Sequence, residues 1–258
     1  MPPLKIMPKI ALLLLAVFVA GCTSRAPRLW NASSIAAYPH PVVLFKDKPK
    51  GKVISGVNTA NVRRMIHIKE LVENAAGQLH TELLISDDTE PNGFSFIGHG
   101  GPKIAVNVGM INLLGDDTDA MAALMGHELA HLYLEHGSLR RNREGNRIIA
   151  STALSFALGM VGIPVPMLMT DAATTTVSNK FSRDEERDAD QFGVEYISKA
   201  GFDPWGAVRL QEKLGTVSGS SRLAFLSTHP ANTERVENMK RLAMGYKLDE
   251  AAPPKGGD

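Results

Sequence analysis

The sequence has few of the features that mark several large classes of protein. It contains one cysteine in 258 residues, which excludes an intrachain disulfide and a cysteine-rich zinc site. Its formal net charge is only +1, so nothing in its charge points to nucleic acid as a partner. With 44% hydrophobic and 21% charged residues, the composition is that of an ordinary globular protein, and a chain of this length can bury a sizeable core.

The N-terminal region also lacks an apolar run long enough to span a membrane. Residues 10–20 are apolar, and these eleven residues fall short of the roughly 20 that a spanning helix needs. Lys5 and Lys9 precede the run, and the small residues Gly21 and Cys22 follow it. A charged start, a short apolar segment and small residues at its end are typical of a secretory signal peptide.

The end of this segment, Val-Ala-Gly-Cys at residues 19–22, resembles the lipobox of bacterial lipoproteins. The resemblance implies that residues 1–21 are a lipoprotein signal peptide and that a lipid on Cys22 anchors the mature chain. Thr23, where some lipoproteins have aspartate, implies the periplasmic face of the outer membrane. A plain signal peptide with an incidental cysteine is the alternative.

The remainder of the chain predicts one α+β domain between a tether and a tail. Residues 22–41 are rich in Ser, Ala, Pro and Arg without periodicity and are expected to be a tether. Residues 248–258 are expected to be a disordered tail. Between them, residues 42–247 are expected to form a mainly helical domain with a small β-sheet beside its active-site helix. Hydrophobic periodicity predicts helices at 61–79, 183–199, 204–214 and 231–243, a further helix carrying residues 124–137, and strands at 41–46, 81–87, 93–98 and 103–108.

One further apolar stretch is long but interrupted. Residues 148–169 carry no charge, yet Gly159, Gly162, Pro164 and Pro166 divide them. The pattern agrees with a buried hairpin, with a segment on a membrane surface and with a subunit contact. It agrees least with a membrane span.

A metal-binding pattern lies in the middle of the domain. His127 and His131 are four residues apart on a predicted helix, so both imidazoles project from one face and can bind the same ion. Glu128 lies beside that ion without needing to ligate it. This H-E-x-x-H arrangement is typical of zinc hydrolases, in which the glutamate takes a proton from zinc-bound water. Two partly exposed histidines on an amphipathic helix are the alternative.

A catalytic zinc usually takes three protein ligands, so a third is expected elsewhere. His136 is one position too early for the histidine of an extended H-E-x-x-H-x-x-G-x-x-H pattern and is predicted to be a polar partner at the helix end. Glu186 and Asp190 are four residues apart beside a buried stripe, where two carboxylates need positive partners. Zinc would satisfy Glu186, and the N–H of a ligating histidine would satisfy Asp190. A solvated acidic face is the alternative.

Together these motifs resemble metallopeptidase family forty-eight, the HtpX- and BepA-type gluzincins. The similarity covers roughly residues 60–242 and rests, in chain order, on PNGFSF, KIAVNVGMINLL, GHELAHLYLEH, FSRDEERDADQFG and STHPANTERV. It implies a zincin-like fold with one zinc ion per chain. The chain lacks the clear membrane spans of HtpX types and the C-terminal repeat domain of BepA types, which leaves its partners open.

The resemblance also implies a role for each site residue. His127, His131 and Glu186 would bind zinc, Glu128 would be catalytic, and Asp190 would support the site. The expected function is hydrolysis of peptide bonds in unfolded or misassembled envelope proteins by a membrane-tethered periplasmic zinc endopeptidase. A zinc-stabilised factor that binds or assembles outer-membrane proteins without cutting them is the main alternative, and a zinc hydrolase acting on a non-peptide substrate is another. The oligomeric state is left open.

His229 is the last histidine of the chain and precedes Pro230, a favoured first residue of a helix. It is therefore expected on a positioned loop. There it would either fill the open zinc position in a resting state or donate a hydrogen bond to the oxyanion during turnover. A histidine that only satisfies backbone groups at the turn is the alternative, and the sequence does not decide between them.

Overall fold

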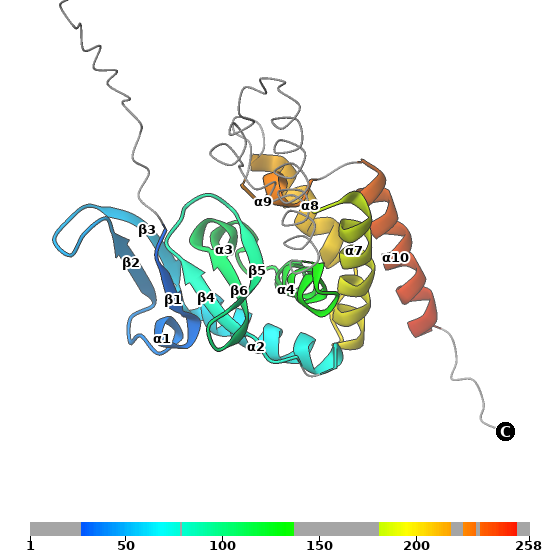
Figure 1. Cartoon of the computed structure of the whole chain (residues 1–258), viewed down its shortest axis with the longest axis horizontal. Coiled ribbons are helices and arrows are strands. Elements are labelled where there is room, and N and C mark those ends of the chain that lie inside the picture. The colour runs from blue at the N-terminus through cyan, green and yellow to red at the C-terminus, as the bar shows by residue number, and fades with distance from the viewer. Residues whose placement is uncertain (1–26, 78, 137–180, 218–223, 231–232, 252–258) are drawn as a thin grey trace, which may run out of the picture.

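The computed structural model describes residues 27–77, 79–136, 181–217, 224–230 and 233–251 (Figure 1). The predicted signal peptide, Cys22 and the apolar residues 148–169 lie outside the described residues.

A four-stranded mixed sheet forms one part of the domain. Its strands, in order across the sheet, are β1 (Leu29–Asn31), β4 (Glu82–Ser86), β6 (Gly101–Asn107) and β5 (Gly93–Gly98). Strands β4 and β6 run parallel, whereas β1 and β5 are antiparallel to their neighbours. The three strands predicted between residues 81 and 108 are confirmed. Because β5 pairs within the described chain only with β6, it is an edge strand.

Two further strands, β2 (Val42–Lys46) and β3 (Val53–Asn58), form a separate antiparallel hairpin. The inner face of this hairpin is buried at Phe45 and Val57. The ring of Phe45 lies 4.6 Å from that of Trp30 in β1, centroid to centroid, and this contact fixes the hairpin to the sheet. The strand predicted at residues 41–46 is confirmed.

The tether predicted for residues 22–41 is too long. Strand β1 pairs with β4, and helix α1 (Ala32–Ala36) follows it directly. Asn31 caps α1 by accepting a hydrogen bond from the Ser33 N–H, and Ala32 and Ile35 are buried in the core. A strand of three residues and a helix of five are too short to produce a readable hydrophobic period, so neither could be predicted from the sequence.

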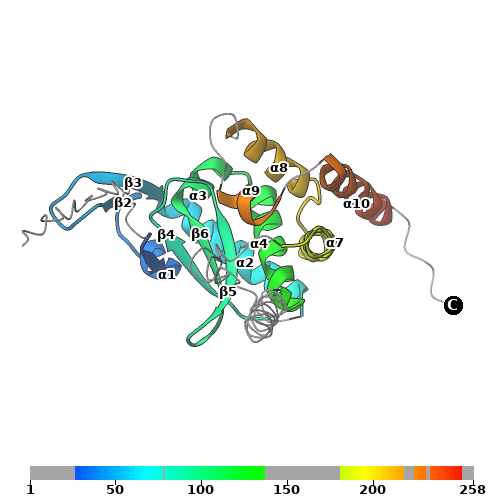
Figure 2. The same cartoon turned by 45° about the horizontal axis from the view of Figure 1, so that its top comes forward.

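The helices are α2 (Thr59–Ala75), α3 (Val108–Leu114), α4 (Thr118–Tyr133), α7 (Arg183–Lys199), α8 (Gly206–Val217), α9 (Ala224–Thr228) and α10 (Thr233–Ala251). In Figure 2, α4 lies between the sheet and the layer formed by α7, α8 and α10. The predicted α+β fold, mainly helical with a small sheet beside the motif helix, is confirmed. No helix in the described part of the chain has both the length and the apolar character needed to cross a membrane.

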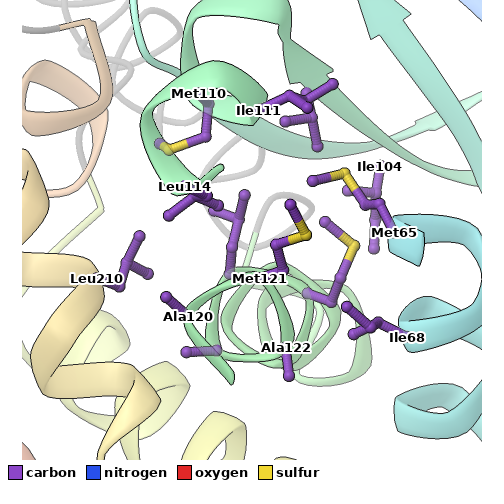
Figure 3. Close-up of a cluster of buried hydrophobic side chains, with 14 of the residues drawn as sticks. Met65, Ile68, Ile104, Met110, Ile111, Leu114, Ala120, Met121, Ala122 and Leu210 are labelled. Atoms are coloured by element: carbon purple, nitrogen blue, oxygen red, sulfur yellow. The ribbon is translucent and has the colours of Figure 1, made fainter. Parts of the chain in front are cut away.

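Helix α4 is the centre of the core. Every residue from Ala120 to His131 is buried, because α2, α7, α8 and the sheet all pack against this helix. Figure 3 shows its apolar side chains meeting those of α2, β6 and α3. Asp117 caps the N-terminus of α4 by accepting a hydrogen bond from the Ala120 N–H.

The predicted boundaries at the C-terminal side hold for one helix and fail for another. Helix α7 has the bounds predicted, and the capping box between Ser182 and Glu185 is present. Helix α10 runs to Ala251, so residues 248–251, predicted to begin a disordered tail, are helical. Residues 252–258 lie outside the described residues.

A buried ion pair fixes the connection between α2 and β4. Glu73 accepts hydrogen bonds from the Thr81 N–H (2.7 Å), the Thr81 hydroxyl (2.6 Å) and Lys69 Nζ (2.7 Å). Lys69 also donates to the Thr81 carbonyl (3.0 Å). Since both ions are buried, each depends on the other for compensation of its charge.

We expect Glu73→Ala to lower the free energy of unfolding by about 3–5 kcal/mol, because it leaves Lys69 buried without its counter-charge. Urea denaturation monitored by circular dichroism measures this. The matched control is Glu70→Ala, at an exposed position of the same helix, which should change stability by no more than about 0.5 kcal/mol. Equal effects of the two substitutions would contradict the assignment.

Candidate metal centre

Helix α4 presents two histidines side by side. The Nε2 atoms of His127 and His131 lie 3.1 Å apart, and both side chains are buried. Their spacing of one helical turn brings the rings together, as the sequence predicted. The nitrogens therefore converge on one point.

Helix α7 brings a carboxylate to the same point. The Glu186 oxygens lie 3.6 Å from His127 Nε2 and 3.6 Å from His131 Nε2. This approach depends on two glycines where the helices cross: a Cβ added at Gly126 would stand 2.7 Å from the carbonyl oxygen of Gly193. Because neither position has a side chain, the backbones come close enough for Glu186 to meet the histidines.

Asp190, one turn after Glu186, supports the first histidine. Its Oδ1 lies 3.1 Å from His127 Nδ1, on the opposite side of the ring from the cluster. A carboxylate that accepts the Nδ1–H keeps the Nε2 lone pair directed at a metal. The structure thus brings Asp190 to the place that the sequence interpretation gave it.

His229 joins the cluster from the segment after α9. Its Nδ1 lies 2.9 Å from Glu186 Oε1 and 3.1 Å from His127 Nε2, and its side chain is buried. One ligand atom from each of His127, His131, Glu186 and His229 can be chosen so that all four lie within 4.8 Å of one another. His229 therefore has a position suited to a fourth ligand.

Arg235 in α10 is a site residue to which the sequence analysis assigned no role. It donates to both oxygens of Asp190 at 2.7 Å, and its Nη1 lies 2.6 Å from Glu186 Oε2. The same Nη1 donates to the Pro230 carbonyl, 2.9 Å away, and so holds the turn after His229. The sequence offered one signal for it: Arg235 is four residues before the apolar Met239, a spacing that places both on one side of a helix, and both are buried.

His136 occupies the helix end, as predicted, but contacts the site. Its Nδ1 lies 3.0 Å from His131 Nδ1. Glu135 has a positive φ of 54°, a left-handed conformation that turns the chain back after α4 and brings the next residue against the helix. His136 is not part of the metal cluster, yet it is the partner of one of its members.

Burial and neighbouring charges shift the pKa values of the cluster residues in different directions. Burial lowers the pKa of the His131 imidazole well below its ordinary value, so this ring is neutral and able to ligate. Burial also disfavours a charge on Glu186, but the imidazoles of His131 and His229 outweigh it and lower the pKa of this carboxyl. For His127, burial is outweighed by Asp190 and Glu186, which raise its pKa.

Glu128 lies beside the cluster with both carboxylate oxygens buried and without a hydrogen-bond partner among the described residues. Its Oε1 is 3.5 Å from His229 Nε2, which also lacks such a partner there. Unsatisfied buried carboxylates are costly, and native proteins retain them where they act. Imidazole nitrogens and a carboxylate are the donor set that zinc takes in catalytic sites, so these residues fit that ion.

The model of peptidase family M48 matches residues 58–243, which includes every residue of the cluster. The chain belongs to peptidase family M48.

Curated relatives of this family member are proteases. The chain is 27% identical over 143 residues to metalloprotease YcaL of Escherichia coli, a match that covers 55% of this chain and 56% of the relative. It is 32% identical over 152 residues to the mitochondrial metalloendopeptidase OMA1 of Arabidopsis thaliana, covering 58% and 29%. It is 28% identical over 170 residues to the beta-barrel assembly-enhancing protease of E. coli, covering 62% and 34%.

These matches span about half the length of the relatives or less. Family and relatives together support a metallopeptidase.

We expect His136→Leu to weaken zinc binding about 10–100-fold, because the outer nitrogen of His131 loses the partner that orients it. Competition with a chromophoric chelator measures this affinity. His136→Gln is the matched variant, since its side-chain oxygen can still accept the His131 Nδ1–H, and it should retain most of the affinity. Equal losses in both variants, together with equal losses of thermal stability, would leave His136 a packing role only.

Proposed function

We propose that the protein is a zinc metalloendopeptidase. The observation that carries the proposal is the placement of Glu128, buried and without a hydrogen-bond partner in the described chain, beside three side chains able to hold zinc. His127, His131 and Glu186 would hold the ion. Zinc, when bound, supplies a Lewis acid that acidifies water and polarises a carbonyl group.

The residues of the chain account for proton transfer and for orientation. Glu128 is the base that takes a proton from water and then delivers it to the leaving nitrogen of the cleaved peptide bond. Asp190 fixes the ring of His127, and Arg235 fixes Asp190 in turn. The reacting groups are thus oriented before substrate arrives, which lowers the cost of reaching the transition state.

The edge strand β5 is the feature that favours a polypeptide as the substrate. It packs on α4, the helix of the metal cluster, and offers an edge there, whereas its neighbour β6 lies between β4 and β5 inside the sheet. An extended chain that pairs with such an edge is recognised through its backbone more than its sequence. We therefore infer that unfolded or misassembled envelope proteins are the substrates and that the role is protein quality control.

The location is part of the same proposal. The lipobox-like residues 19–22 support a lipid anchor at Cys22 on the periplasmic face of the outer membrane. Of the three relatives named above, two are from E. coli, and one of these is named for the assembly of β-barrels. A non-cleaving binding factor for outer-membrane proteins is the second candidate, but such a factor has no need of a base at Glu128.

We expect Glu128→Gln to keep the fold and the zinc while slowing casein cleavage by at least about 100-fold, because an amide does not accept the proton of water. Peptide release and elemental analysis are the two measurements. Glu70→Gln, a substitution at an exposed position of α2, is the matched control and should cleave normally. Wild-type cleavage by Glu128→Gln would refute the proposal. Absence of cleavage by wild-type protein loaded with zinc would favour the binding factor.

A second substitution tests the role of His229. Because its Nδ1 lies among the ligand atoms, we expect His229 to occupy the position that water needs, so that His229→Ala cleaves casein several-fold faster with the zinc content unchanged. Steady-state kinetics with elemental analysis measures this. A loss of about tenfold or more in kcat with zinc retained would instead make His229 a donor to the oxyanion.

A further inference from the structure

The hairpin β2–β3 exposes apolar side chains on its outer face. Val42, Leu44, Val53 and Ile54 have exposed fractions of 44%, 58%, 42% and 38%. Leu44 and Val42 lie over Gly56, since a Cβ added there would stand 2.9 Å from Leu44 Cδ2 and 3.6 Å from Val42 Cγ1. With its inner face already buried, this two-stranded sheet is apolar on both sides. An apolar face of this kind on a thin, projecting element indicates an interaction surface.

The turn of the same hairpin is basic. Lys46, Lys48, Lys50 and Lys52 are all exposed, and Asp47 is the single acidic residue between positions 42 and 58. The hairpin therefore carries a formal charge of +3, four lysines less one aspartate, on a chain whose total charge is +1. Within residues 42–58 the positive charge therefore gathers at the turn, residues 46–52.

Apolar side chains beside a cluster of lysines match one surface chemistry closely. In a bilayer that contains anionic lipids, lysines are attracted to the headgroups while neighbouring aliphatic side chains enter the boundary with the acyl chains. A short, twisted hairpin with Leu and Val on one face and Lys at its turn presents both groups together. An acidic protein surface would use the lysines but would leave Leu44 and Ile54 without a role.

The N-terminal segment places the hairpin near the same surface. Arg28 donates from its guanidinium to the Lys46 carbonyl and, at 3.1 Å, to Asp87, so the chain before β1 is fixed against the hairpin. Cys22 stands six residues before Arg28. Six extended residues span at most about 20 Å, so a lipid on Cys22 would hold the hairpin within that distance of the bilayer.

We propose that the outer face and turn of hairpin β2–β3, residues 42–54, dock on the anionic surface of the lipid bilayer. This inference rests on the proposed lipid anchor at Cys22. In Figures 1 and 2 the hairpin and helix α10 lie at opposite ends of the molecule, with α4 between them. Docking through the hairpin holds the metal centre away from the lipid, on the side open to periplasmic polypeptides.

The test uses the full, lipidated protein with Leu44→Cys, labelled at the introduced thiol with an environment-sensitive fluorophore. Cys22 is the only native cysteine, so lipidation leaves one thiol to label. The protein is reconstituted into vesicles of phosphatidylethanolamine with phosphatidylglycerol, and into neutral vesicles with phosphatidylcholine instead. We expect emission about threefold stronger and shifted to shorter wavelength in the anionic vesicles. Met244→Cys on α10, itself half exposed, is the matched label and should not change.

Charge reversal separates docking from mere proximity. Adding Lys48→Glu and Lys50→Glu should return the emission to the level in neutral vesicles, whereas Lys240→Glu with Arg241→Glu on α10 should leave it unchanged. Casein cleavage should be the same in all these variants, and incorporation of a fatty-acid analogue at Cys22 reports the anchor separately. Equal emission in both kinds of vesicle, or emission that does not change when the lysines are reversed, would overturn the proposal. So would detergent-solubilised protein that forms a dimer in sedimentation and gives the same emission without vesicles.

Discussion

The close approach of α4 and α7 is the constraint on which the site depends. The two helices touch through backbone at Gly126 and Gly193, where a Cβ would stand within 3.0 Å of backbone atoms on the other helix. A larger residue at either position would separate the helices and draw Glu186 away from His127. The same contact makes α4 the most enclosed element of the fold, which excludes water from groups whose electrostatic interactions are strongest in a low dielectric.

Burial of so many ionisable groups is tolerated because their charges alternate. Arg235 lies between Asp190 and Glu186 and contacts both carboxylates, while Asp190 in turn contacts His127. Burial disfavours a charge on Arg235, but the two carboxylates outweigh it and raise the pKa of the guanidinium. A cation held by His127, His131 and Glu186 would add positive charge beside Glu128, whose carboxylate has no hydrogen-bond partner among the described residues.

The sequence predicted those features that depend on spacing within one helix. The positions of His127 and His131, and of Glu186 and Asp190, follow from four-residue spacing, and the bounds of α7 are those predicted, 183–199. It did not predict features that depend on chain reversals. His136 meets His131 through a left-handed residue, and Arg235 meets Asp190 from a helix 45 residues away. Neither contact leaves a periodic trace in the sequence.

The contacts of Arg235 with the site have a consequence for how the metal centre folds. The histidines belong to the middle of the chain, whereas the cation that neutralises their supporting carboxylates belongs to the last helix, α10. Without α10, Asp190 and Glu186 would both lose the guanidinium that they contact, and only imidazoles would remain beside these buried carboxylates. The metal centre therefore has its full set of compensating charges only when α10 is docked, although this helix carries none of the clustered ligand residues.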